Sequence, residues 1–174
     1  MEEAILSTIV IDCKREAIKK GLKVWFPVKG SSMTPLIRGK DRIAIMACCM
    51  NRLKPGDMIV FQREASDRMI AHRIIKKIKE GAGYSFITKG DSSLNCDRLA
   101  VLPYMVLGKI SDIQKPGFKI YIDSLPGKIL NMFMLMLSLS RIIYLGRLIW
   151  IRIKLSSKHK ADHCHQNNFV SETK

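Results

Sequence analysis

Residues 39–62 read GKDRIAIMACCMNRLKPGDMIVFQ, and this stretch decides the expected fold. It contains two short apolar runs, at 42–47 and 58–62, and each run follows a turn sequence, Gly-Lys-Asp at 39–41 and Pro-Gly-Asp at 55–57. Such residues favour turns because glycine accepts positive φ angles, proline fixes φ, and aspartate hydrogen-bonds to nearby backbone groups. Short apolar runs bounded by turns of this kind predict β-strands.

The same alternation of apolar runs and turns extends through most of the chain. Further strands are expected at residues 23–28, 69–78, 84–88, 106–113 and 118–122. The turn sequences between them are Gly-Ala-Gly at 81–83, Gly-Asp-Ser-Ser at 90–93 and Lys-Pro-Gly at 115–117. Strands at this spacing predict a mainly β fold with coiled, partly closed sheets.

The two ends of the chain differ from this β-rich region. Apolar residues at helical spacing over 4–20, followed by Gly21, predict a short N-terminal helix. After Ser-Leu-Pro-Gly at 124–127 the chain becomes strongly apolar, and its last residues are polar. The predicted parts are an N-terminal helix (1–21), a β domain (22–124), an apolar and basic helical segment (125–155) and a disordered tail (156–174).

The composition restricts the partners of the protein. The length of 174 residues suffices for one domain with its own core, and 30 Lys+Arg against 15 Asp+Glu give a net charge of +15. A surplus this large indicates an anionic neighbour, such as nucleic acid, an acidic lipid surface or an acidic substrate. The sequence has no zinc-finger spacing, recognition-helix pattern or basic-aromatic alternation, so we expect no specific nucleic acid.

The cysteines and C-terminal histidines predict neither a disulfide framework nor a metal site. The 5 cysteines form an odd set without framework spacing, which favours reduced thiols. His159, His163, Cys164 and His165 have the spacing of metal ligands, but they lie in the polar tail without a supporting strand. We therefore expect neither a metal nor another cofactor.

The apolar C-terminal segment suggests contact with a membrane surface. The acidic start of the chain and Asp12 argue against a signal peptide or an N-terminal span. Residues 129–140 are too short to span a bilayer, and a longer span would place Arg141 and Arg147 inside it, at about 2.5–3.5 kcal/mol each near the centre. We expect residues 129–155 to form either a helix pair or a helix that lies on acidic headgroups, so that the protein is membrane-associated, on a side that the sequence does not specify. The alternative is a helix packed on the core.

A serine, a histidine and two aspartates form the candidate catalytic set. Ser32 lies in Gly-Ser-Ser-Met-Thr-Pro at 30–35, directly after a predicted strand. Serine is a weak nucleophile until a base takes its proton, and His72 is the only histidine in the β region. Asp91 and Asp97 lie in a glycine-containing loop, and either could orient an imidazole. Without the other members of the set, each of these residues is better explained as an ordinary residue of a strand or a turn.

The order of these residues along the chain resembles that in one enzyme family. The boxes are Gly-Ser-Ser-Met-Thr-Pro at 30–35, Pro-Gly-Asp followed by apolar residues at 55–61, His-Arg-Ile-Ile at 72–75, Lys-Gly-Asp-x5-Asp at 89–97 and Val-Leu-Gly-Lys-Ile at 106–110. Together they resemble the type I signal peptidases in their archaeal and endoplasmic-reticulum form. The resemblance covers roughly residues 22–113 and implies the coiled β-fold of that family.

The resemblance assigns a role to each candidate. It implies a serine endopeptidase that cleaves a leader or signal peptide after small residues, with Ser32 as nucleophile. His72 stands where the bacterial enzymes carry a lysine general base. Asp97 is the first choice for the carboxylate that orients His72, and Asp91 is the second. The substrate partner would be a peptide or protein precursor, and Met33 would pack under the nucleophile.

Three departures indicate a divergent member with its own substrate. Gly30 occupies a position where many family members carry a serine that helps to hold the oxyanion, and loss of such a donor costs about 3 kcal/mol of transition-state stabilisation. The turn at 39–41 has one residue more than the family's Gly-Asp. Residues 1–21 are also not expected to form the N-terminal membrane anchor that the family carries.

Two other functions fit parts of the sequence. Self-cleaving repressors carry a similar Gly-x-Ser-Met box, but their base is a lysine and a DNA-binding domain precedes it. Here the matching strand carries His72, and residues 1–21 are too short for such a domain. A non-catalytic module that binds membrane surfaces on a peptidase fold is the other alternative.

Overall fold

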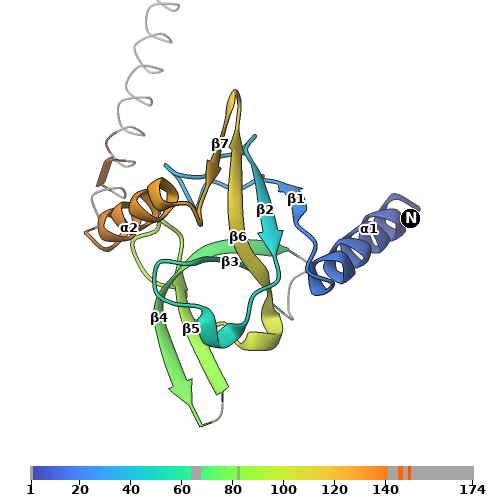
Figure 1. Cartoon of the computed structure of the whole chain (residues 1–174), viewed down its shortest axis with the longest axis horizontal. Coiled ribbons are helices and arrows are strands. Elements are labelled where there is room, and N and C mark those ends of the chain that lie inside the picture. Colours follow the sequence, from blue (N-terminus) through green and yellow to red (C-terminus); the bar gives the residue numbers. More distant parts are fainter. Residues whose placement is uncertain (1, 64–67, 82, 141–144, 147–148, 150–174) are drawn as a thin grey trace, which may run out of the picture.

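The computed structural model describes residues 2–63, 68–81, 83–140, 145–146 and 149. Its centre is one antiparallel sheet of seven strands with the order β1-β2-β6-β3-β4-β5, and β7 pairs with β6 (Figure 1). The strands are β1 (Val24–Pro27), β2 (Arg42–Met46), β3 (Met58–Gln62), β4 (Met69–Glu80), β5 (Gly83–Lys89), β6 (Val106–Lys115) and β7 (Phe118–Tyr121). The mainly β fold predicted from the turns is confirmed, and each expected run contains one strand.

The middle of the sheet is buried on both faces. In β3, Met58 and Val60 belong to one apolar cluster, whereas Ile59 and Phe61 belong to another. Successive side chains of a strand point to opposite faces, so this alternation puts β3 between two separate cores. A strand buried on both faces reads as a continuous apolar run, as residues 58–61 do.

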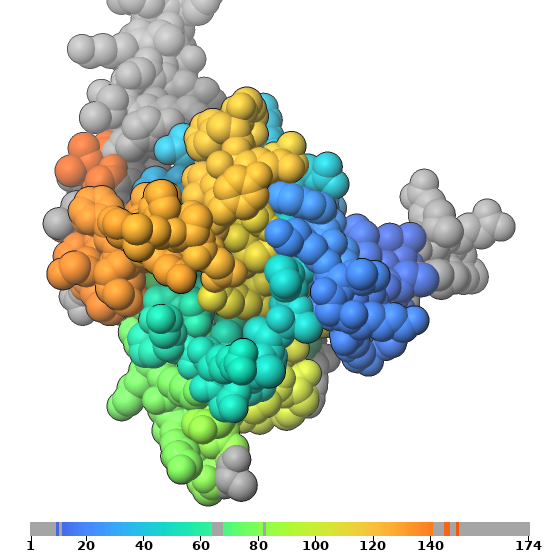
Figure 2. All heavy atoms as spheres, viewed as in Figure 1, coloured from blue at the N-terminus to red at the C-terminus, as the bar shows by residue number. Residues whose placement is uncertain are grey.

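Two helices pack against the larger cluster from different sides (Figure 1). Helix α1 (Glu2–Lys19) covers most of the predicted N-terminal helix and buries Ile18 there. Helix α2 (Leu125–Leu139) buries Met134 in the same cluster. Two short 3₁₀ turns, Met50–Arg52 and Pro103–Met105, complete the regular structure. In Figure 2, α2 (orange) and α1 (blue) lie at opposite sides of the molecule.

The start of α2 is fixed against the end of β7. The Ser124 hydroxyl accepts a hydrogen bond from the Gly127 N–H at 3.2 Å, which satisfies one free donor of the first helical turn. A Cβ placed on Gly127 would lie 1.9 Å from the carbonyl oxygen of Tyr121, so only glycine permits this approach. The helix therefore begins at the boundary expected from Ser-Leu-Pro-Gly.

Most of the predicted C-terminal parts lie outside the described residues. This applies to the disordered tail at 156–174 with its four candidate metal ligands, and to most of the basic stretch after residue 140. In the described part of the chain, no helix is long and apolar enough to cross a membrane.

Candidate active site

His72 and Asp97 form a hydrogen-bonded pair at the junction of β4 and the loop after β5. The Nδ1 atom of His72 lies 2.7 Å from Oδ2 of Asp97. Only 12% of the His72 side chain and 19% of the Asp97 side chain are exposed. Thr88, near the end of β5, holds Asp97 twice: its carbonyl accepts from the Asp97 N–H at 2.8 Å, and its hydroxyl donates to Oδ2 at 2.6 Å.

These contacts determine the protonation of the pair. Burial raises the pKa of Asp97, but hydrogen bonds from His72 and Thr88 outweigh burial and hold this pKa below its ordinary value. The carboxylate is therefore ionised at neutral pH and can only accept hydrogen bonds. Because the carboxylate can only accept, Nδ1 of His72 carries the shared proton, and in the neutral imidazole Nε2 then has the lone pair that a base requires.

The backbone around Ser32 is held by the loop that follows β5. The carbonyl oxygen of Ser32 accepts from the N–H of Ser92 at 2.8 Å and from its hydroxyl at 3.0 Å. Gly90 allows this approach, because a Cβ placed on it would lie 2.8 Å from the Ser32 carbonyl oxygen and 3.0 Å from the Ser32 Cβ. Met33 is buried in the larger apolar cluster and anchors the next position.

The Gly90 loop connects the backbone of Ser32 to the end of the β4–β5 ladder, one residue away from His72. Arg73 pairs with Lys89 at the end of the antiparallel β4–β5 ladder, and Gly90 follows Lys89 directly. Ser32 is half-buried against the same glycine. Within the described residues, no hydrogen bond joins the Ser32 hydroxyl to the His72 ring. Such bonds are often long without substrate and shorten when it binds.

Asp91, the second candidate for orienting the base, pairs with Arg73 instead of His72. The guanidinium of Arg73 donates from Nε to Oδ1 and from Nη2 to Oδ2, both at 2.7 Å. Both side chains are fully buried. Because successive residues of β4 point to opposite faces, His72 and Arg73 each receive a separate aspartate. The structure thus brings together His72 with Asp97 and places Asp91 on the other face of the strand.

Arg73 also connects the site to the turn before β3 and to α2. Its Nη1 donates to the Gly56 carbonyl at 2.9 Å and to the side-chain oxygen of Asn131. The Asn131 amide donates to the same Gly56 carbonyl at 2.8 Å. A buried charge needs partners of this kind to offset its desolvation. Arg73 and Asn131 therefore fix how α2 sits on the strand that carries His72.

An aromatic ring and a second arginine complete the surroundings of the base. The ring of Phe61 meets that of His72 edge to face, with centroids 6.2 Å apart. The Arg63 guanidinium lies 5.4 Å from the centroid of the Phe61 ring, and its positive charge helps to lower the pKa of Asp97. Across the described residues, no group of three or more His, Cys, Asp or Glu side chains could hold a metal ion.

Sequence reasoning missed several residues of this arrangement. Arg73 and Lys89 lie inside the sequence boxes that resemble the signal peptidases. Because side chains alternate along a strand, the sequence alone could have predicted that Arg73 and His72 point to opposite faces of the sheet. Thr88, Ser92 and Asn131 carry no comparable signal, because polar residues of these types are common at strand ends and on helices. No protein-family model and no curated protein matches this chain.

Proposed function

We propose that this protein is a serine endopeptidase of the signal-peptidase type, with Ser32 as nucleophile and His72 as general base. The observation that carries the proposal is the half-buried His72–Asp97 pair, which lies at the end of the β4–β5 ladder beside the loop whose Gly90 closely approaches Ser32. An ionised carboxylate on Nδ1 gives His72 the tautomer that a general base requires.

The chemistry follows from these positions. The Ser32 oxygen attacks the carbonyl carbon of the scissile peptide bond while Nε2 of His72 takes the hydroxyl proton. Asp97 stabilises the imidazolium, which then gives its proton to the leaving amine as the C–N bond breaks. A water molecule, activated by the same imidazole, hydrolyses the acyl-enzyme and releases the carboxylate product. By resemblance, the substrate is the leader or signal peptide of a precursor protein.

Labelling with a fluorophosphonate probe tests the nucleophile. We expect one covalent adduct per chain by intact mass, located on Ser32 by peptide mapping and lost in Ser32→Ala and His72→Gln. Ser31→Ala is the matched control, because Ser31 is the adjacent serine in the same box. Adduct formation on Ser32→Ala at the wild-type rate would contradict the proposal.

The second part of the proposal is that α2 rests on a membrane surface. Six large apolar side chains of α2 are each more than half exposed: Leu125, Ile129, Met132, Phe133, Met136 and Leu139. Contiguous apolar patches on a protein surface mark interaction sites. The net charge of +15 favours acidic headgroups as the partner. The same patch is the observation that favours the alternative function, a non-catalytic membrane-surface module.

Flotation with phosphatidylglycerol-containing liposomes tests the membrane contact. We expect the full chain to float and the double variant Met132→Ser/Met136→Ser to remain at the bottom of the gradient. Leu22→Ser is the matched control, since Leu22 is 57% exposed but lies between α1 and β1. Equal flotation of both variants would argue against α2 as the contact. Flotation without probe labelling would favour the non-catalytic module.

A further inference from the structure

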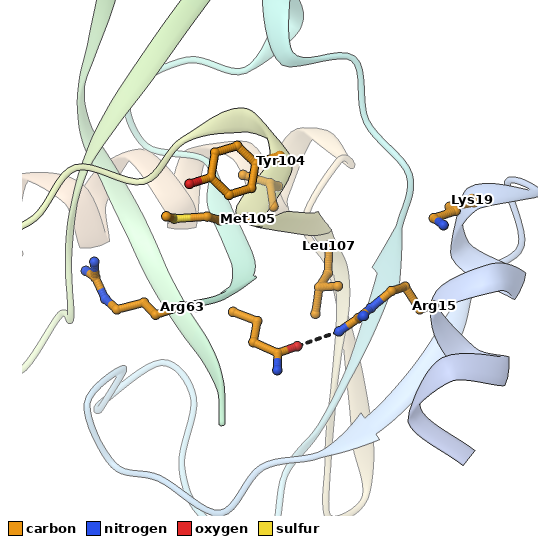
Figure 3. A pocket seen from close by; sticks show the side chains of 8 residues that line it. Arg15, Lys19, Arg63, Tyr104, Met105 and Leu107 are labelled. Atoms are coloured by element: carbon orange, nitrogen blue, oxygen red, sulfur yellow. Dashed lines mark hydrogen bonds between the residues drawn. The ribbon is translucent and has the colours of Figure 1, made fainter. Parts of the chain in front are cut away.

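A cationic pocket lies between α1 and the adjoining ends of β3 and β6 (Figure 3). Its volume is about 430 Å³. Among the described residues that line it, Arg15 and Lys19 from α1 and Arg63 after β3 are cations, and none of these described residues is a carboxylate. The remaining lining residues are Gln62, Tyr104, Met105, Val106 and Leu107. A pocket lined by both cationic and apolar side chains suits the binding of an acidic side chain of a peptide.

The cations of α1 are available to an incoming carboxylate. Arg15 extends from α1 toward Gln62, whose side-chain oxygen accepts from Nη2 at 2.5 Å (Figure 3). The Nε atom of Arg15 is buried and has no hydrogen-bond partner among the described residues. Arg15 and Lys19 also meet Asp12 at 3.7 Å and Glu16 at 2.7 Å, respectively. Such exposed pairs on one helix contribute about 0–1 kcal/mol, so a ligand carboxylate can replace them.

The pocket adjoins the catalytic pair through one aromatic side chain. Arg63 lines the pocket, and its guanidinium lies over the ring of Phe61. The same ring meets the imidazole of His72 edge to face. The charge of Arg63 also helps to lower the pKa of Asp97, so the pocket and the His72–Asp97 pair share this arginine. The pocket therefore lies beside the pair at which a peptide substrate would be held.

We infer that this pocket binds aspartate or glutamate side chains of the substrate and selects precursors that are acidic within a few residues of the cleaved bond. The inference rests on the proposed function and adds a substrate class to it. It gives the net charge of +15 a specific role, because acidic peptides are attracted to such a surface. Helix α2, which carries the exposed apolar side chains, lies at the opposite side of the molecule from α1 (Figure 1), so the two surfaces are on different elements.

Binding is measured on full-length Ser32→Ala, so that the peptide stays intact. The probes are two fluorescent peptides of equal length, one with glutamates near a small-residue site and one with glutamines in their place. We expect the glutamate peptide to bind at least tenfold more tightly in fluorescence anisotropy. Adding Arg15→Gln and Lys19→Gln should remove most of this preference. Adding Lys79→Gln, an exposed cation at the far end of β4, should leave the preference unchanged.

Each outcome decides the inference without requiring peptide hydrolysis. Equal binding of the two peptides, or an equal preference in the Arg15→Gln/Lys19→Gln and Lys79→Gln variants, would overturn it. Displacement of the glutamate peptide by phosphatidylglycerol vesicles, in a variant that carries Met132→Ser/Met136→Ser, would assign the pocket to a lipid headgroup and also overturn it. If the preference is present but Ser32 takes no fluorophosphonate, the pocket stands as an acidic-peptide site and the peptidase proposal fails.

Discussion

The side chain of Lys89 reaches the last turn of α2, where its ammonium group donates to the carbonyl oxygen of Ser138 at 2.5 Å and to the Ser138 hydroxyl at 2.9 Å. Both side chains are buried. A cation at the C-terminal end of a helix satisfies free carbonyl groups and complements the helix dipole. With the contact between Arg73 and Asn131, this gives α2 two polar attachments to the strands beside the Gly90 loop. Helix α2 is therefore part of the frame that holds the candidate active site.

The contribution of Lys89 can be measured by the change Lys89→Met. Removing the ammonium leaves the Ser138 carbonyl buried without this donor, and we expect the free energy of unfolding to fall by about 1–3 kcal/mol. Urea denaturation followed by circular dichroism gives this value. The matched control is Lys79→Met, because Lys79 is exposed on β4, and its change should stay within about 0.5 kcal/mol. Equal effects of the two changes would show that the contact does not stabilise the fold.

The two aspartates of the Gly90 loop should give opposite phenotypes when each becomes asparagine. Asp91→Asn removes the charge that faces the buried Arg73, and we expect a loss of about 3–5 kcal/mol in unfolding free energy. Asp97→Asn should leave the fold in place but lower peptide hydrolysis by about four orders of magnitude, because His72 loses the correct tautomer. Denaturation and turnover measured on both variants test this. A stable, inactive Asp91→Asn would reverse the assignment.

The lowered pKa of Asp97 predicts a dependence of stability on pH. A carboxyl group with a folded-state pKa below its unfolded value stabilises the protein above the unfolded value, here near 3.8. This stabilisation is lost as the pH falls through the folded-state pKa. The difference in unfolding free energy between wild type and Asp97→Asn should therefore shrink as the pH falls below about 4. A difference that grows as the pH falls below about 4 would contradict the pKa shift.

Gly30→Ser should increase the rate of the proposed reaction. A Cβ placed on Gly30 has nothing within 4 Å, so the serine that many signal peptidases carry at this place fits without displacement. An added hydroxyl donor to the oxyanion is expected to raise kcat by about tenfold or more. Gly30→Ala is the control, because it adds the Cβ without the hydroxyl. A rise of the same size in Gly30→Ala would remove oxyanion stabilisation as its cause.

Gly90→Ala should displace the nucleophile. The added methyl group would meet the Ser32 carbonyl at 2.8 Å, and the backbone on one side must move. We expect a loss of about 1–3 kcal/mol in unfolding free energy and a large fall in the rate of fluorophosphonate labelling. In the control Gly83→Ala the nearest atom is 3.7 Å away, so this variant should behave like the wild type. Normal labelling of Gly90→Ala would show that this contact does not position Ser32.

The strands were predictable because their ends carry strong local signals. The turn at 55–57 is one case: Gly56 has a φ of +96°, and the Asp57 carboxylate accepts from the N–H of Lys54 at 3.0 Å. Such interactions lie within a few residues of each other and can be recognised without tertiary structure. The same holds for the start of α2, where Ser124 caps the helix.

The pairing of the two aspartates could not be predicted in the same way. Asp91 and Asp97 lie six positions apart in one loop, and spacing alone does not tell which one faces the histidine side of β4. The answer depends on Thr88, which holds Asp97 by two hydrogen bonds after the chain has turned back toward β5. The cationic pocket depends likewise on how α1 packs beside β3, which no local pattern specifies.

Because His72 and Arg73 point to opposite faces of the sheet, the candidate site forms only when β4 pairs in the correct register. If β4 paired one residue out of place, the imidazole and the guanidinium would exchange faces, and each would lose its aspartate. A misassembled sheet would thus hold no competent base and would also bury an unpaired cation. On the proposed function, a chain whose β4 is out of register lacks its general base, so peptide cleavage begins only after this strand has paired correctly.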